Sequence, residues 1–177
     1  GNIGGNVLGS VEAERITFNE KTLWRGGPNT SRGAAYYWDV NKQSAHVVGE
    51  IREAFTKGDW QKAELLTRKN FGEFYIETGL SSVGMTGYRR ELSLDSALAK
   101  VSFCKDGVQY EREYFVSHPA NVMAVRFAAS HRGKQNLVFS YAPNPVSTGE
   151  MKADGTDALC WLARLDNNSM EYAVRIK

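Results

Sequence analysis

Most of the chain after Gly72 alternates apolar and polar residues with the two-residue period of a β-strand. Short runs of this kind recur about every ten residues, with turn-forming residues between them. The runs are Phe74–Ile76, Tyr88–Leu94, Leu98–Lys105, Val108–Val116, Val122–Ala129, Leu137–Tyr141, Ala158–Leu165 and Met170–Ile176. Many short strands separated by turns indicate a mainly β fold, and we expect an antiparallel β-sandwich, of the large kind called a supersandwich.

Two turns suggest how these strands pair. Asp106-Gly107 joins two alternating runs and is a strong hairpin sequence, because both residues accept a positive φ. His118–Asn121 contains proline and asparagine and ends the second run with another turn. One face of the strand between these turns should carry Val108, Tyr110, Arg112, Tyr114 and Val116.

A helical pattern interrupts the strands before residue 70. Ser44–Lys57 spaces its apolar residues as a helix does, with Ser44 as N-cap and Gly58 as the stop. Asp59 can cap a second helix over Trp60–Lys69. Its expected apolar members are Trp60, Ala63 and Leu66, with Leu65 as a weaker candidate. We therefore expect a short αα-hairpin inserted at about residues 44–70.

The opening segment, Asn6–Asn19, contains apolar residues broken by glycines and charges. It predicts two short strands around a turn at Glu12-Ala13-Glu14. A loop rich in Gly, Pro, Asn, Ser and Thr follows over Trp24–Tyr37. The passage from helix to strand at Asn70–Glu73 is very short, which suggests that a loop is missing from the sequence there.

Composition limits the classes of function. Of the 177 residues, 42% are apolar and 24% are charged, which fits an ordinary globular domain with a sizeable core. The net charge is +2 and no basic tract occurs, which argues against a nucleic-acid partner. No apolar run approaches the ~20 residues that span a bilayer.

Cysteine and histidine spacing gives no sign of a metal site. Cys104 and Cys160 lie in strand-like runs, and we expect two buried free thiols rather than a disulfide. Neither cysteine has a metal-ligand spacing, and the three histidines are scattered. We therefore predict no metal in this chain.

The chain shows no convincing reaction centre. A glycosidase needs two carboxyl groups across a sugar ring, about 5–9.5 Å apart. The acidic candidates, none of them in a recognisable pocket motif, are Glu12, Glu14, Glu20, Glu73, Glu77 and Asp95. Glu12 and Glu14 share the predicted turn, and we expect both to be solvated. Because G-x-S-x-G and the phosphate-binding loops are also absent, we predict no catalytic residue and no cofactor.

Two charged runs have a simpler explanation than a ligand. Arg89–Glu91 and Glu111–Glu113 alternate charges along expected strands. Cross-strand ion pairs on a solvated or domain-facing sheet explain both runs.

The stretch Phe18–Pro28 has the most unusual composition, since it combines amide, hydroxyl, acidic, indole and guanidinium groups before a Gly-Gly-Pro turn. Sugar recognition uses such a set, because an aromatic face takes the C–H face of a pyranose and polar groups take its hydroxyls. A strand end followed by a turn, with Trp24 in the core, explains the same stretch.

The order of motifs adds a family resemblance. N-E-K-T-L-W-R-G-G-P, G-D-W-Q-K-A-E, Y-R-R-E-L-S-L-D and R-E-Y-F-V-S-H-P follow one another along the chain. This order resembles the N-terminal domain of the family 95 glycoside hydrolases, the inverting α-L-fucosidases, over Gly1 to about Tyr141. The resemblance implies a β-sandwich over 1–177 that precedes a catalytic (α/α)6 barrel, with the acid and base machinery in that barrel.

The resemblance also implies roles for this domain. It would brace the barrel of the same chain and line part of a site for a fucosylated or related oligosaccharide, while being inactive alone. The candidates for lining the site are Asn19, Thr22, Trp24 and Arg25. A periplasmic or secreted location is expected on the same ground.

Two other functions remain open from the residues alone. A stand-alone carbohydrate-binding module would use Trp24, Trp38 and Tyr36-Tyr37 for stacking. A purely structural domain would place all of these aromatic side chains in its core.

Overall fold

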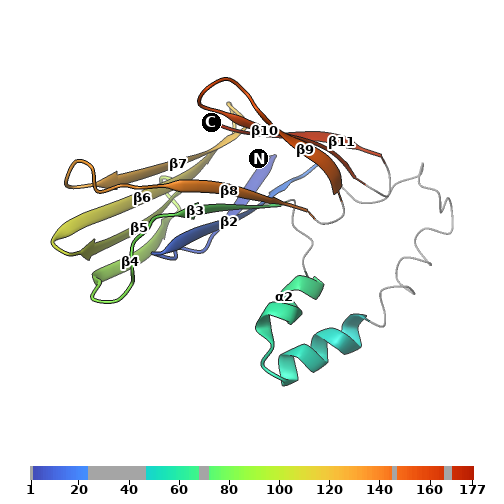
Figure 1. The fold of residues 1–177 in the computed structure, drawn as a ribbon, viewed down its shortest axis with the longest axis horizontal. Helices are drawn as coiled ribbons and strands as arrows, with labels where there is room; N and C mark the ends of the chain where they lie inside the picture. The colour runs from blue at the N-terminus through green and yellow to red at the C-terminus, as the bar shows by residue number, and fades with distance from the viewer. Residues whose placement is uncertain (1, 24–46, 68–71, 145–146, 166–168) are drawn as a thin grey trace. The chain divides into compact units, whose positions relative to one another are not determined.

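The computed structural model describes residues 2–23, 47–67, 72–144, 147–165 and 169–177. The described part of the chain is mainly β, as predicted, and all of its strand pairs are antiparallel. Figure 1 shows the strands, which are β1 Ile3–Val7, β2 Ala13–Glu20, β3 Gly72–Glu77, β4 Thr86–Ser93, β5 Leu98–Lys105, β6 Val108–Ser117, β7 Val122–Ala129, β8 Val138–Pro143, β9 Ser147–Ala153, β10 Leu159–Leu165 and β11 Glu171–Ile176.

The chain divides into two compact units. The first contains Gly1–Thr22 and Asn70–Pro143, and the second contains Leu23–Lys69 and Asn144–Lys177. The first unit holds two four-stranded sheets, with strand orders β1-β2-β3-β8 and β4-β5-β6-β7. The second unit holds a three-stranded sheet, with the order β11-β10-β9, and a helical segment. The prediction that 1–177 form a single domain stays a prediction.

The core of the first unit lies between its two sheets. Ile16 on β2 and Ile76 on β3 pack in one cluster with Val101, Phe103 and Tyr110 of the opposite sheet. The Phe103 and Tyr110 rings stack with centroids 5.1 Å apart. Because both sheets contribute alternate residues to one core, the first unit is a β-sandwich, and this confirms the predicted fold class.

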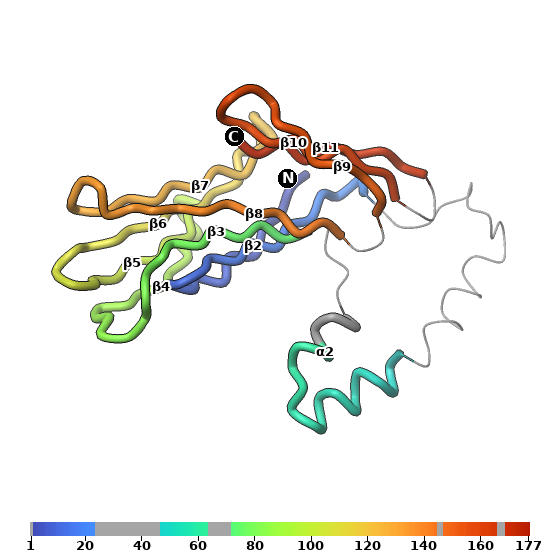
Figure 2. Tube along the Cα trace, viewed as in Figure 1, coloured from blue at the N-terminus to red at the C-terminus, as the bar shows by residue number. Residues whose placement is uncertain are grey.

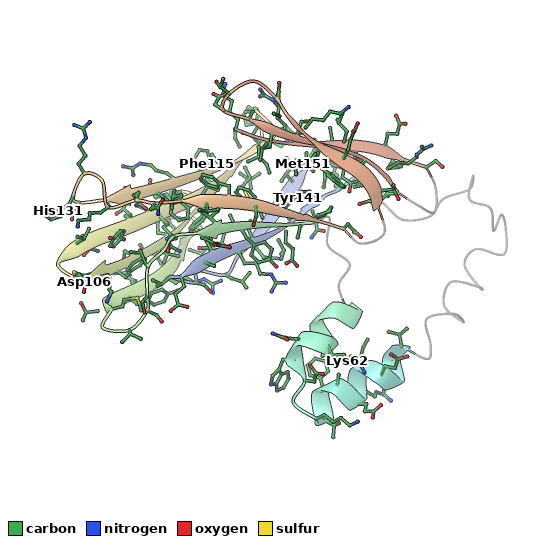
Figure 3. All side chains as sticks on the ribbon, in the orientation of Figure 1. Lys62, Asp106, Phe115, His131, Tyr141 and Met151 are labelled. Atoms are coloured by element: carbon green, nitrogen blue, oxygen red, sulfur yellow. The ribbon has the colours of Figure 1, made fainter. Side chains whose placement is uncertain are left out.

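The predicted hairpin at Asp106-Gly107 is confirmed. Asp106 and Gly107 have φ of 50° and 77°, as a type I′ turn requires at both central positions. Figure 3 labels Asp106 at the tip of this β5–β6 hairpin, and the tube in Figure 2 follows the tight reversal. The next predicted turn is also present, since Asn121 has a φ of 52° before β7 begins.

Two strand predictions were wrong. The turn between the first strands spans residues 8–12, whereas Ala13 and Glu14 already belong to β2. No strand was predicted over β9, because its only large apolar side chain is Met151. Pairing with β10 makes this segment a strand. Gly149 allows the close approach, because a Cβ there would lie 2.3 Å from the Leu162 carbonyl oxygen.

The αα-hairpin is confirmed where the structure describes it. Residues 47–56 are helical, and Gly58 follows with a φ of 70°. The second helix, α2, spans Trp60–Thr67, and the Asp59 carboxylate accepts from the backbone N–H of Lys62 at 3.0 Å. The expected N-cap at Ser44 lies outside the described residues. Of the expected apolar members of this helix, Ala63 is buried, whereas 64% of Trp60 is exposed.

The second unit's sheet has two faces of different chemistry. One face carries Met151, Trp161 and Val174, which are directly opposite one another on the three strands. The other face carries Glu150, Leu162 and Ala173 in the next row. The Tyr172 hydroxyl group donates to Ser147 Oγ at 2.8 Å across this sheet.

Candidate functional site

Two of the four predicted sugar-contacting residues lie in the described part of the chain. Asn19 is exposed near the end of β2, and Thr22 is exposed in the turn that follows. The Glu20 carboxylate accepts from the Thr22 backbone N–H at 2.8 Å and also from its hydroxyl group. Trp24 and Arg25 lie outside the described residues. Asn19 and Thr22 therefore share one end of β2, and their role in sugar binding stays a prediction.

Asn19 lies on a polar face of β2. Side chains alternate along a strand, so Asn19, Thr17 and Arg15 share the face that points away from core residue Ile16. On this outer face the Asn6 amide donates to Thr17 Oγ1 at 3.3 Å across the β1–β2 pair. The outer face of the first sheet therefore presents hydrogen-bonding groups in rows.

The same outer face contains a buried carboxylate. Arg15 donates to Glu73 through two parallel hydrogen bonds, Nε to Oε2 at 2.9 Å and Nη2 to Oε1 at 2.7 Å. The Tyr75 hydroxyl group also donates to Glu73 Oε2. Glu73 is only 1% exposed. Two-point pairing of this kind fixes the direction of both side chains as well as their distance.

A second buried carboxylate, Glu14, lies on the inner face of β2. Its Oε1 accepts from the backbone N–H groups of Gly9 at 2.7 Å and Arg15 at 3.1 Å. Its Oε2 accepts from the Tyr114 hydroxyl group at 2.5 Å and lies 3.4 Å from Arg112 Nη1. Glu14 is fully buried and Arg112 is 2% exposed. A charge buried this deeply needs such partners, because desolvation alone would strongly disfavour it.

Arg112 links this carboxylate to the connection between β1 and β2. Its Nη1 and Nη2 donate to the backbone carbonyls of Ser10 at 2.5 Å and Val11 at 2.7 Å. Its guanidinium carbon lies 5.2 Å from the Phe103 ring centroid and 4.9 Å from that of Phe127. Residues 8–12 also accept side-chain hydrogen bonds of 2.8–3.2 Å from Thr78, Tyr88 and Arg90. The connection is thus held by several neighbouring elements.

Tyr114 completes this buried cluster, which we call the Glu14 cluster (Glu14, Arg112 and Tyr114). Burial raises the pKa of the Tyr114 phenol far above its ordinary value, and the nearby Glu14 carboxylate raises it further. Tyr114 therefore stays protonated and acts as a hydrogen-bond donor to Glu14.

The two buried carboxylates cannot form an acid–base pair with each other. Glu14 is opposite Ile76 and points into the core, whereas Glu73 pairs with Arg15 on the outer face. Strand alternation therefore places their carboxyl groups on opposite sides of one sheet. Both also accept hydrogen bonds from fixed donors, which leaves neither arranged across a sugar ring.

The prediction that Glu12 and Glu14 are both solvated is confirmed for Glu12 and wrong for Glu14. Glu12 is exposed, and it accepts from the backbone N–H of Ser82 at 3.1 Å and its hydroxyl group at 2.8 Å. The backbone hydrogen bond is the main reason why the pKa of Glu12 lies below its ordinary value. For Glu14 the prediction was wrong, because β2 already begins at Ala13 and turns Glu14 inward. The signal that could have found the Glu14 cluster was Arg112, because the strand period had placed this charged residue on one face with Val108, Tyr110, Tyr114 and Val116.

The predicted cross-strand ion pairs are present for Glu111 and Glu113, on the outer face of the second sheet. For the run Arg89–Glu91 the described ion pair lies within β4, between Arg89 and Glu91, and Arg112 of the second run is buried instead. Glu113 is opposite Lys100 on β5 and Arg126 on β7, with nitrogen–oxygen distances of 3.0 Å and 2.9 Å. Arg126 also lies 3.6 Å from Glu111. We call this set the outer ladder (Lys100, Glu111, Glu113 and Arg126).

Other predicted features can be placed more briefly. Cys104 and Cys160 are free thiols, as predicted, but both are half-buried rather than buried. Within the described ranges, no group of three or more His, Cys, Asp or Glu side chains could hold a metal ion. The described helices include none with the length and apolar character needed to cross a membrane.

Comparison with known proteins decides the family. The sequence pattern described as "Glycosyl hydrolase family 65, N-terminal domain" matches residues 1–177. The chain belongs to this family. The prediction of a glycoside hydrolase N-terminal domain is therefore confirmed at this level, and the finer assignment to family 95 stays a prediction.

Individual relatives carry more specific names. The chain is 32% identical over 157 residues to "Probable alpha-fucosidase A" of Aspergillus niger, covering 81% of this chain and 20% of that protein. It is 27% identical over 153 residues to "Alpha-L-fucosidase 2" of Arabidopsis thaliana, covering 80% of this chain and 17% of that protein. A match to "Probable alpha-fucosidase A" of Aspergillus oryzae has 25% identity over 132 residues. The chain spans about a fifth of the length of these relatives.

Proposed function

We propose that this chain is the non-catalytic N-terminal β-sandwich domain of an inverting α-L-fucosidase of family 95. Its role is to brace a catalytic (α/α)6 barrel of the same polypeptide and to line part of the site for a fucosylated or related oligosaccharide. The observation that carries this proposal is the similarity to three named α-fucosidases, each of which is about five times as long as the matched segment.

The geometry of the carboxylates supports a non-catalytic role. Glu14 and Glu73 are buried on opposite faces, and Glu12 and Glu20 accept hydrogen bonds from Ser82 and Thr22. Each of these four carboxylates therefore already accepts a hydrogen bond from a donor within this domain. The acid and base of the reaction are therefore assigned to the barrel.

The sugar-lining role is assigned to Asn19, Thr22, Trp24 and Arg25. Asn19 and Thr22 are exposed at the same end of β2, where an amide and a hydroxyl group can reach a ligand. Trp24 and Arg25 follow directly in the sequence and would add a stacking surface and a charged donor. A periplasmic or secreted location belongs to the same proposal.

Two measurements test the proposal. Hydrolysis of an aryl α-L-fucoside by this chain alone should be undetectable, and a rate near that of a full-length relative would refute the non-catalytic role. In the full-length enzyme, Thr22→Val should raise KM for the fucoside, while the matched control Thr86→Val, at an exposed position on β4, should leave KM unchanged. Equal KM values for both variants would remove Thr22 from the site.

A binding experiment separates this role from a stand-alone carbohydrate-binding module. Calorimetry of this chain with fucose, galactose and fucosylated oligosaccharides should give little heat, because one wall of a site offers few contacts. Strong heat at millimolar sugar, lost on changing Trp24 to Ala, would favour the binding module instead.

A further inference from the structure

The charged residues of β2 divide between its two faces, and each has a partner of its own. Glu14 points inward to Arg112 and Tyr114 on β6 of the opposite sheet. Arg15, its neighbour, points outward to Glu73 on β3 of the same sheet. One strand is therefore tied to two different neighbours by adjacent residues of opposite charge.

The apolar pattern of β2 specifies its position only weakly. Its large inward apolar residues are Ile16 and Phe18, so a shift by two residues would keep apolar side chains on the inner face. Such a shift would carry Glu14 about 6.7 Å along the strand axis. Glu14 would thus move away from its partners on β6, Arg112 and Tyr114. The Arg15–Glu73 ion pair alone would oppose this shift only weakly. Glu77 lies on the same outer face as Glu73, so Arg15 could pair with Glu77 in the shifted register.

A shift by one residue is opposed by both charges at once. A shift that placed Arg15 opposite Ile76 would turn Arg15 inward toward Arg112 and would place Glu14 outward, opposite Glu77. Two attractive pairs would then become two repulsive ones, in addition to the loss of apolar packing. Such ion pairs destabilise a wrong register as well as stabilising the correct one. They therefore make the pairing of the strands more specific.

We infer that Glu14 and Arg15 form a register lock for β2, and that they are positioning residues for Asn19 and Thr22 at the end of that strand. The lock follows from the contacts of β2 alone. The second part rests on the proposed function, because it concerns residues assigned to the sugar site.

Engineered disulfides can report the register directly. Ala13 and Glu77 are opposite each other and flank the hydrogen-bonded pair of Glu12 and Thr78, so they form a non-hydrogen-bonded pair of suitable spacing. Cysteines at 13 and 77 therefore report the native register, in a chain whose Cys104 and Cys160 are changed to serine. Cysteines at 17 and 75 report the shift by two residues that brings Arg15 opposite Glu77, because in the native register these positions are diagonal and about 7–8 Å apart.

The measured quantity is a ratio of two disulfide yields after mild oxidation. The yield of the cysteine pair that reports the shifted register is divided by the yield of the pair that reports the native register. Glu14→Gln should raise this ratio by about tenfold or more, because it leaves Arg112 buried without its carboxylate. The matched control Glu12→Gln changes an exposed neighbour and should leave the ratio unchanged. A variant that only loosened the sandwich would lower both cross-links without altering their ratio.

A second variant covers the case in which Glu14→Gln does not fold. Tyr114→Phe removes one of the contacts to Glu14 and should raise the ratio by a smaller factor. An unchanged ratio in every folded variant would overturn the lock.

The positioning role has its own readout. In the full-length enzyme, Tyr114→Phe should raise KM for the fucoside in parallel with the cross-link ratio. If the ratio rises and KM does not change, the lock stands and the assignment of Asn19 and Thr22 to the sugar site fails. If the ratio does not change, the lock fails whatever KM does.

Discussion

The two faces of β6 place two neighbouring charged side chains in opposite environments. Arg112 points inward, is 2% exposed and contacts Glu14, two backbone carbonyls and two aromatic rings. Glu113, the next residue, points outward in the outer ladder and pairs with Lys100 and Arg126. Strand alternation alone separates the two residues.

This difference shows how burial changes the stability that is lost when one member of an ion pair is removed. In the outer ladder, water replaces a lost partner, so each pair contributes little and is screened by salt. In the Glu14 cluster water is excluded, so removing one charge leaves the other desolvated and unpaired. Losing one partner of an ion pair is therefore expected to cost little stability on the outer face of β6 and much more on the inner face.

The largest effect is expected from breaking the buried pair. Arg112→Met keeps much of the side-chain volume but leaves Glu14 charged and removes the donors to Ser10 and Val11. The free energy of unfolding should fall by about 3–5 kcal/mol, as is typical when one partner of a buried pair is removed. Urea denaturation followed by circular dichroism would measure this loss. If Arg112→Met lowered the free energy of unfolding no more than a variant of the outer ladder does, the two faces of β6 would not differ as described.

A double variant sharpens that result. In Glu14→Leu combined with Arg112→Met, no buried charge remains, so the loss should be smaller than the sum of the two single losses. The coupling energy from this cycle separates the penalty of an unpaired charge from the value of the pair. Additive losses would show that Glu14 and Arg112 act independently.

Much of the fold could be predicted because its signals are local. The alternation over Leu98–Lys105 and Val122–Ala129 gave both strand bounds, and Asp106-Gly107 gave the hairpin between β5 and β6. Asp59 and Gly58 marked the helix boundary, because capping depends on a few neighbouring residues.

The failures concern properties that depend on distant residues. The burial of Glu14 depends on Arg112, about a hundred residues away, and β9 became a strand through its pairing with β10. Trp60 fits a helical period, but the period does not say whether anything covers that face. The same limit applies to the proposed sugar site. The sequence motif names Trp24 and Arg25 as candidates, but a motif does not determine where their side chains lie.

An intermediate effect is expected from removing a single hydroxyl group from the Glu14 cluster. Tyr114→Phe deletes the donor to Glu14 and should lower the free energy of unfolding by about 1–3 kcal/mol. The pKa of Tyr114 is raised in the folded state above its ordinary value of 10.0. The stability that accompanies this shift is complete below that value and declines as the pH rises above it. The parent chain should therefore lose stability above pH 10.0 more steeply than Tyr114→Phe does, and equal slopes would contradict the burial of Tyr114.

The smallest effect is expected in the outer ladder. Hydrogen bonds from Lys100 and then from Arg126 lower the pKa of Glu113 below its ordinary value of 4.5. A lowered carboxyl pKa gives stability that is present above that ordinary value and is lost as the pH falls through the folded-state pKa. Glu113→Gln should therefore cause a slight loss of stability at neutral pH and none once Glu113 is protonated in the parent chain.

Salt provides the control that separates the two faces. Because Arg126 is exposed and Glu113 and Lys100 are only partly buried, solvent ions reach these pairs, and raising the ionic strength should shrink the small difference in stability between the parent chain and Glu113→Gln. The loss caused by Arg112→Met should stay nearly constant, because ions do not reach the buried cluster. Denaturation midpoints at low and high salt would show this, and a salt-sensitive Arg112→Met would mean that water and ions enter between the sheets. The comparison of the two faces of β6 depends on that exclusion of water more than on the number of ion pairs on either face.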